Sequence, residues 1–210
     1  MKKHLLIILI SMLSHVSLAQ TKVSEAEKRQ VIEKFDRVSA SMKSMQCTFT
    51  QKKTNKLLSR DIVSRGVMYY AAPSKLRWQY TSPYDYTFII NGDNVSIKST
   101  KKTQQIKVSE NKIFRQITSI ILSTITGGSI SKSKDFSVEI WKSGNGYFAK
   151  LYPKKKEVKQ IYKVIELTFT PRLTMISTVK MVEKTGDATI VTLNNVKLNT
   201  RINENLFTTK

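Results

Sequence analysis

The chain has 210 residues, a net charge of +21 from 36 Lys and Arg against 15 Asp and Glu, and a hydrophobic fraction of 40%. Apolar residues recur at regular spacing without low-complexity tracts, which excludes a disordered chain and favours a packed domain. The positive charge favours anionic partners: lipid head groups, lipopolysaccharide, acidic protein surfaces or nucleic acid.

The first 19 residues have the pattern of an export signal. Lys2 and Lys3 precede an apolar run over residues 5–13, and residues 17–19 form a small-x-small cleavage sequence. This run is too short to cross about 30 Å of hydrocarbon as a helix. We therefore expect cleavage after Ala19, which leaves 210 − 19 = 191 residues with a charge of 34 − 15 = +19. Export argues against nucleic acid as the partner.

The histidine and cysteine content argues against several kinds of active site. His4 and His15 lie in the expected signal, so the exported chain has no imidazole for a catalytic triad or a zinc site. Cys47 is the single cysteine, and we expect a buried, unreactive thiol without a disulfide. No two carboxylates have the spacing of a general acid and base on one helix face or in one loop. No glycine-rich loop that could bind phosphate follows a predicted strand. We expect no enzyme, no metal and no cofactor.

A first helix is expected from Ser24, which forms a capping box with Glu27. One apolar stripe follows at helical spacing. Its members are Val31, Phe35, Val38, Met42 and Met45.

Between Cys47 and about Val108 the apolar period changes to two, which is typical of strands. A hairpin is expected where Asn91-Gly92-Asp93-Asn94 separates two short apolar runs. Lys75, Arg77 and Gln79 alternate with apolar residues and need partners or solvent, so their neighbours are expected to share the opposite, apolar face. The residues expected on that concave face are Met68, Tyr70, Leu76, Trp78, Tyr80, Phe88 and Ile90.

A second helix is expected from about Lys112 to Ile125, ended by Gly127 and Gly128. It is rich in isoleucine and able to cover an apolar sheet, so we expect it to act as a lid. Its lid residues are Ile113, Ile117, Ile120 and Ile121.

Strand patterning then resumes to the end of the chain. The segments are Phe136–Trp141, Tyr147–Tyr152, Gln160–Phe169, Leu173–Val182 and Thr189–Leu198. Short turns between adjacent strands predict an antiparallel meander, and no linker divides the chain. We expect a single, mainly β domain with a few helices over residues 20–210, and a monomer.

Short lysine clusters interrupt the strand patterns. Lys154, Lys155 and Lys156 form one of them. Lysines at strand ends commonly protect a sheet edge from pairing with another chain. The alternative is a docking patch for an anionic partner such as a membrane surface.

The order of short motifs resembles the periplasmic outer-membrane lipoprotein carrier (LolA-like) family. These motifs are Phe49-Thr50-Gln51-Lys52, Ser64-Arg65-Gly66, Pro73, Leu76-Arg77-Trp78, Tyr80, Pro83, Ile89-Ile90-Asn91-Gly92, Val95, Asp135-Phe136, Leu151, Pro153-Lys154, Gly186-Asp187, Thr189 and Phe207. The resemblance implies an incomplete, strongly curved antiparallel β-barrel whose apolar concave face is covered by α-helices. It also implies a carrier without catalysis or cofactor, which holds lipoprotein acyl chains and moves them from an inner-membrane transporter to an outer-membrane acceptor.

Two positions depart from the family pattern. The residue before Pro73 is often basic in the family, where it is associated with lid closure and release, and here it is Ala72. The chain also ends soon after Phe207, where some family members continue. Two other readings remain: a carrier of another lipid or glycolipid, and an exported module that binds polyanions or adheres to surfaces.

Overall fold

The computed structural model describes residues 20–55, 60–110, 122, 130, 133 and 135–209. Twelve strands form one sheet in the order β1-β8-β9-β10-β11-β12-β2-β3-β4-β5-β6-β7. The strands are β1 (Thr21–Lys22), β2 (Ser44–Thr54), β3 (Ile62–Ala71), β4 (Lys75–Ser82), β5 (Tyr86–Asn91), β6 (Asn94–Ser99), β7 (Thr103–Lys107), β8 (Phe136–Ser143), β9 (Gly146–Pro153), β10 (Tyr162–Phe169), β11 (Ile176–Glu183) and β12 (Ala188–Leu198). The helices with described bounds are α1 (Glu25–Ala40), α3 (Lys156–Ile161) and the 3₁₀-helix η2 (Glu204–Phe207).

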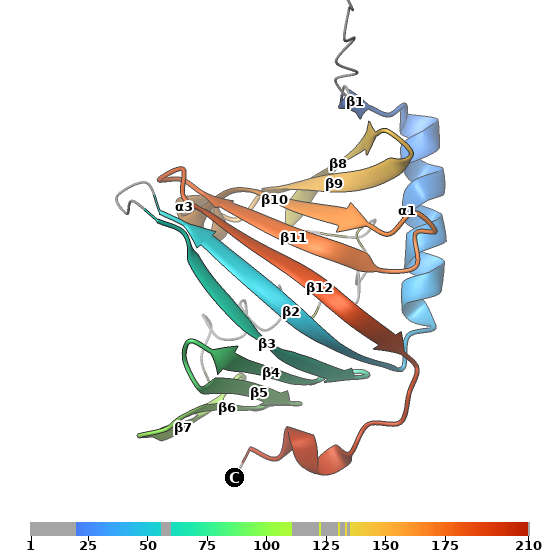
Figure 1. The fold of residues 1–210 in the computed structure, drawn as a ribbon. Helices are drawn as coiled ribbons and strands as arrows, with labels where there is room; N and C mark the ends of the chain where they lie inside the picture. Colours follow the sequence, from blue (N-terminus) through green and yellow to red (C-terminus); the bar gives the residue numbers. More distant parts are fainter. Residues whose placement is uncertain are drawn as a thin grey trace, which may run out of the picture.

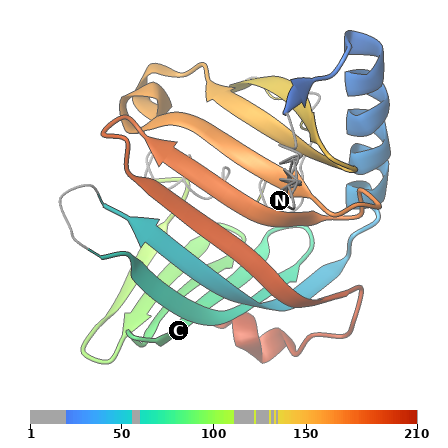
Figure 2. The same ribbon diagram turned by 45° about the horizontal axis from the view of Figure 1, so that its top comes forward.

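The sheet is antiparallel and consists of two meanders, β2–β7 and β8–β12. The pairing of β12 with β2 joins them, with Leu193 opposite Phe49. The twist that accumulates across the strands curls the sheet, and Figure 2 shows β4–β7 turned behind β2 and β3. The sheet stays open, because β1 and β7 at its two ends do not pair with each other.

Helix α1 packs on one face of the β8–β11 half, which we call the inner face. The Ser24 hydroxyl accepts a hydrogen bond from the Glu27 backbone N–H at 3.2 Å, which confirms the Ser24 half of the predicted capping box. The Glu27 carboxylate accepts a hydrogen bond from the Tyr147 hydroxyl at 2.7 Å. The Phe35 ring lies 4.7 Å from the Phe169 ring, and Phe35 is 1% exposed. The helix therefore closes a hydrophobic core against these strands.

Three expectations about element boundaries were wrong. The apolar stripe predicted a helix as far as Met45, but α1 ends at Ala40 and Met45 is a buried residue of β2, opposite Tyr70. The helical spacing of apolar residues continues beyond Ala40, but pairing with β3 makes Met45 part of a strand. Leu173 was expected to begin a strand, but it lies in the turn before β11 with φ of 58°. Gln160 was expected in a strand, but it belongs to the short helix α3.

The outer face of β4–β7 is crossed by the C-terminal segment. Side chains on four successive strands donate hydrogen bonds to the backbone carbonyls of residues 206–209. These donors are Arg77, Asn91, Lys98 and Gln105. The Phe207 side chain is fully buried. Arg77 and Gln79 therefore face away from the apolar inner face, as alternation predicts.

The two ends of the strands form two distinct rims. Along the α1 rim, the helix α1 crosses the ends of β8–β12 at the right of Figure 1. At the opposite α3 rim lie α3, the β4–β5 and β6–β7 turns and the β11–β12 turn. No helix in the described part is long and apolar enough to span a membrane.

Candidate functional site

The seven residues expected on the concave face share the inner face of β3, β4 and β5. Register places them in cross-strand rows: Met68–Trp78–Phe88, Tyr70–Leu76–Ile90 and, at the end of β4, Tyr80 opposite Tyr86. All seven belong to or pack against one hydrophobic cluster, which also includes Phe49, Val95 and Val191. The alternation in the sequence therefore predicted correctly that these residues share one face of the sheet.

Exposure along this apolar surface changes from one rim to the other. Toward the α1 rim, Tyr70 is 3% exposed, and Leu76 and Ile90 are fully buried. Toward the α3 rim, the rings of Trp78, Tyr80, Tyr86 and Phe88 are only half-buried. The apolar inner face is therefore buried toward the α1 rim and partly exposed to solvent toward the α3 rim.

An aromatic cluster forms the centre of this surface. The Phe49 ring lies 4.3 Å from the Trp78 ring and 5.2 Å, edge-on, from the Tyr80 ring. Tyr80 in turn lies 6.1 Å from Tyr86. Phe49 and Tyr86 were not among the expected site residues. The alternation of Cys47, Phe49 and Gln51 was a signal for Phe49, but it could be used only once the pairing of β2 with β3 was known.

Gly66 is the position that lets Phe49 lie flat on the sheet. A Cβ atom added at Gly66 would stand 2.0 Å from the Gln79 carbonyl oxygen and 2.5 Å from Cζ of Phe49. Both distances are far below van der Waals contact, and the carbonyl belongs to the backbone of β4.

We expect Gly66→Ala to lower the free energy of unfolding by about 1–3 kcal/mol, because overpacking displaces Phe49 and β4. Urea unfolding monitored by circular dichroism measures this loss. Gly146→Ala is the matched control, since its added Cβ would approach nothing closer than the Ser143 carbonyl at 3.7 Å. Equal stability of Gly66→Ala and the wild type would contradict the close packing of Phe49 at this position.

The polar groups beside the aromatic cluster are neutral, whereas the same face nearer the α3 rim carries the ion pair of Lys53 with Glu183 at 4.0 Å. The Tyr80 hydroxyl donates to Oε1 of Gln51 at 2.9 Å, and burial raises the pKa of Tyr80. Burial also raises the pKa of the Cys47 thiol to about 12, so the thiol stays protonated at neutral pH, in line with the unreactive cysteine expected. Among the described residues no group of three or more His, Cys, Asp or Glu could hold a metal ion. The surface around Trp78, Tyr80 and Phe88 can therefore bury apolar groups.

The expected lid falls on a part of the chain that is not described: Ile113, Ile117, Ile120 and Ile121 lie outside the described residues. Two described residues of the same connection touch the inner face. Leu122 packs against the cluster that contains Trp78 and Phe88, and Ile130 is 6% exposed in the core under α1.

The expected docking patch lies at the α3 rim. Lys154, Lys155 and Lys156 are all exposed and lead into α3. Lys155 forms an ion pair with Asp135 at 2.7 Å.

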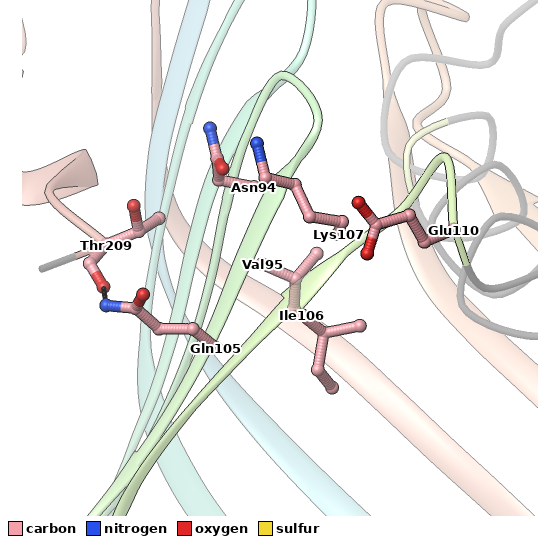
Figure 3. Close-up of a pocket in the computed structure, with 7 residues that line it drawn as sticks. All are labelled: Asn94, Val95, Gln105, Ile106, Lys107, Glu110 and Thr209. Carbon is pink, nitrogen blue, oxygen red and sulfur yellow. Dashed lines mark hydrogen bonds between the residues drawn. The ribbon is translucent and has the colours of Figure 1, made fainter.

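A separate small pocket lies at the other end of β6 and β7, next to the C-terminal segment (Figure 3). Its volume is about 180 Å³, and its lining combines polar side chains with Val95 and Ile106. Gln105 reaches across it to donate a hydrogen bond to the Thr209 carbonyl at 2.9 Å. It contains none of the expected site residues, and its mixed lining does not suit an acyl chain.

Two comparisons with known protein sequences relate this chain to lipoprotein carriers. The family model described as "Outer membrane lipoprotein carrier protein LolA" matches residues 40–210. An outer-membrane lipoprotein carrier protein of Pseudoalteromonas translucida (strain TAC 125) is 25% identical over 168 residues, which cover 80% of this chain and 77% of that protein.

Solved structures with low sequence identity are similar to this chain. MucB is 9% identical with a TM-score of 0.51, and the match covers 88% of this chain and 63% of MucB. A LolA superfamily protein from Nitrosomonas europaea is 11% identical with a TM-score of 0.46, covering 86% and 96% of the two chains. The likeness to MucB shows a common fold and nothing further.

Proposed function

Because the chain belongs to the LolA family of outer membrane lipoprotein carrier proteins, we propose that it binds the acyl chains of lipoproteins on its inner face and carries them through the periplasm. The observation that supports this proposal most strongly is the open side of the apolar surface. Half-buried Trp78, Tyr80 and Phe88 continue a fully buried core toward the α3 rim, which is what a site that admits an apolar ligand requires.

The energetics of acyl burial suit a carrier. Each CH₂ group moved from water to an apolar site is worth ~0.8 kcal/mol. One chain of roughly 14 buried CH₂ groups is then worth on the order of 11 kcal/mol, so acylated cargo cannot cross an aqueous compartment unshielded. The half-buried rings supply apolar surface for this purpose, and among the described residues no carboxylate or lysine belongs to their hydrophobic cluster.

The proposal assigns roles beyond the binding surface. The residues of the wall are Met68, Tyr70, Leu76, Trp78, Tyr80, Phe88 and Ile90, and the isoleucines at 113, 117, 120 and 121 remain its candidate cover. The carrier would receive cargo from an inner-membrane transporter and deliver it to an outer-membrane acceptor. It performs no catalysis in this scheme, which needs only binding and release.

A second ligand class uses the same surface equally well. A lipid or glycolipid without a protein part would fill the apolar face by the same burial of CH₂ groups. The alternative of another class, a polyanion-binding or adhesion module, uses the lysines and leaves the inner face unoccupied.

Organic extraction of the protein purified from its own cells, followed by mass spectrometry, separates these functions. The proposal predicts acylated polypeptides in the extract, at amounts that fall when the wall is disrupted by Trp78→Glu. Free lipid alone would favour the second ligand class. An extract without any acylated molecule, together with no binding of added lipopeptide, would reject the carrier function.

A further inference from the structure

The two most exposed large apolar side chains of the described residues both lie at the α3 rim. Tyr84, in the β4–β5 turn, is 66% exposed, and Ile161, at the end of α3, is 54% exposed. Ile62 and Val63 at the start of β3 are 38% and 39% exposed. No large apolar side chain among the described residues is exposed at the α1 rim. Apolar side chains that are exposed on one side of a molecule indicate an interaction surface there.

Basic residues surround these side chains. The described basic residues at this rim are Lys52, Lys53, Arg60, Lys101, Lys102, Lys154, Lys155, Lys156, Lys159, Lys163 and Lys184, and the carboxylates are Asp61, Asp85, Asp135, Glu157, Glu183 and Asp187. Three of the carboxylates form ion pairs with Lys52, Lys53 and Lys155. The Ile161 carbonyl accepts a hydrogen bond from the Lys184 backbone N–H at 3.0 Å, so this lysine stands beside the exposed isoleucine. The rim carries excess positive charge around its apolar residues.

We propose that the α3 rim is a membrane-docking surface, which places Ile161 and Tyr84 in the interface of an anionic phospholipid bilayer while the surrounding lysines contact the head groups. Exposed aliphatic and aromatic side chains at the same rim as many lysines match the layered polarity of that interface. Each lysine near an anionic surface adds attraction, which falls as salt screens it.

Docking in this orientation would turn the open side of the inner face toward the bilayer. Trp78, Tyr80 and Phe88 are reachable from the same rim that carries Ile161 and Tyr84. An acyl chain could then pass between bilayer and inner face with a short exposure to water. The role of docking in acyl transfer rests on the proposed carrier function. Membrane docking itself requires only the residues of the α3 rim.

The test is sedimentation of the purified protein, without its first 19 residues, with vesicles of phosphatidylethanolamine and phosphatidylglycerol or of phosphatidylcholine alone. Binding to the anionic vesicles is expected to exceed binding to the neutral ones, and to fall in the triple variant Lys154→Glu, Lys156→Glu, Lys159→Glu by at least about tenfold. The matched control reverses Lys43, Lys107 and Lys197, which are exposed at the α1 rim and change the net charge equally. The control is expected to lose much less.

A fluorescent label reports which side of the molecule enters the interface. An environment-sensitive dye on Ile161→Cys should brighten and shift to shorter wavelength on anionic vesicles, and the same dye on Lys43→Cys should not. Cys47 is buried with a raised pKa and will not compete for the label. The double variant Tyr84→Ser, Ile161→Ser should weaken binding at a salt concentration where electrostatic attraction is screened.

Equal loss of binding in the two triple variants would overturn the proposal, because attraction would then follow net charge and not the rim. An unchanged dye signal on bound protein would also overturn it. Lipopeptide binding measured in the same variants without vesicles keeps the two proposals separate: lost docking with intact lipopeptide binding leaves the carrier function standing, and the reverse outcome leaves the docking surface standing.

Discussion

Replacing Trp78 by glutamate is expected to lower the affinity for a triacylated lipopeptide by at least about a hundredfold, which corresponds to about 2.8 kcal/mol. Trp78 stands at the centre of the wall, 4.3 Å from Phe49 and opposite both Met68 and Phe88. An acyl chain that covers an ionised carboxylate displaces the water bound to the carboxylate and cannot replace those hydrogen bonds. This desolvation costs free energy and weakens binding. Isothermal titration calorimetry measures the change.

Gln79→Glu is the matched control, because it introduces the same charge one residue further along β4 on the opposite face. Gln79 accepts hydrogen bonds from Arg77 there, at 3.1 and 3.2 Å, and a glutamate would keep them. Burial beneath an acyl chain raises the pKa of the glutamate introduced at position 78. Binding by Trp78→Glu should therefore recover in mild acid, where that carboxyl is protonated. Equal affinity of the two variants at neutral pH would contradict binding at the inner face.

Phe35→Ala is expected to lower the free energy of unfolding by about 3–5 kcal/mol, the usual cost of removing a fully buried ring. Phe35 is 1% exposed, and its contact with Phe169 fixes α1 against the sheet. Natural domains are stable by about 5–15 kcal/mol, so this single change removes a large part of the total. Urea unfolding followed by circular dichroism gives the value.

Glu33→Ala, on the exposed side of the same helix, is the control for Phe35→Ala. It should stay within about 0.5 kcal/mol of the wild type. A loss below about 1 kcal/mol for Phe35→Ala would show that α1 contributes little to the core, which would contradict the packing seen in the structure.

The apolar face of β3, β4 and β5 could be predicted from sequence because strand alternation carries strong physical information. Lys75, Arg77 and Gln79 cannot lie on an apolar face without partners, so Leu76, Trp78 and Tyr80 had to share the other face. The hairpin at Gly92 could also be predicted from the sequence. In the structure Gly92 adopts a positive φ of 59° in the turn between β5 and β6.

Long-range pairing and short elements left no comparable signal. The pairing of β12 with β2 joins segments far apart in the chain, and without it Phe49 could not be placed in the site. Helix α3 has only 6 residues, too few to show a helical period. The gathering of Tyr84 and Ile161 at one rim depends on where each strand ends, and strand ends are set by pairing.

Quenching of tryptophan fluorescence by a lipopeptide with brominated acyl chains tests the central claim most directly. Trp78 lies on the inner face, whereas Trp141 lies on the outer face, where its indole N–H donates to Glu139 at 3.1 Å. Acyl binding at the inner face predicts strong quenching in Trp141→Phe, where Trp78 remains, and little in Trp78→Phe. Equal quenching of the two variants, or quenching of Trp141 alone, would contradict the proposed site.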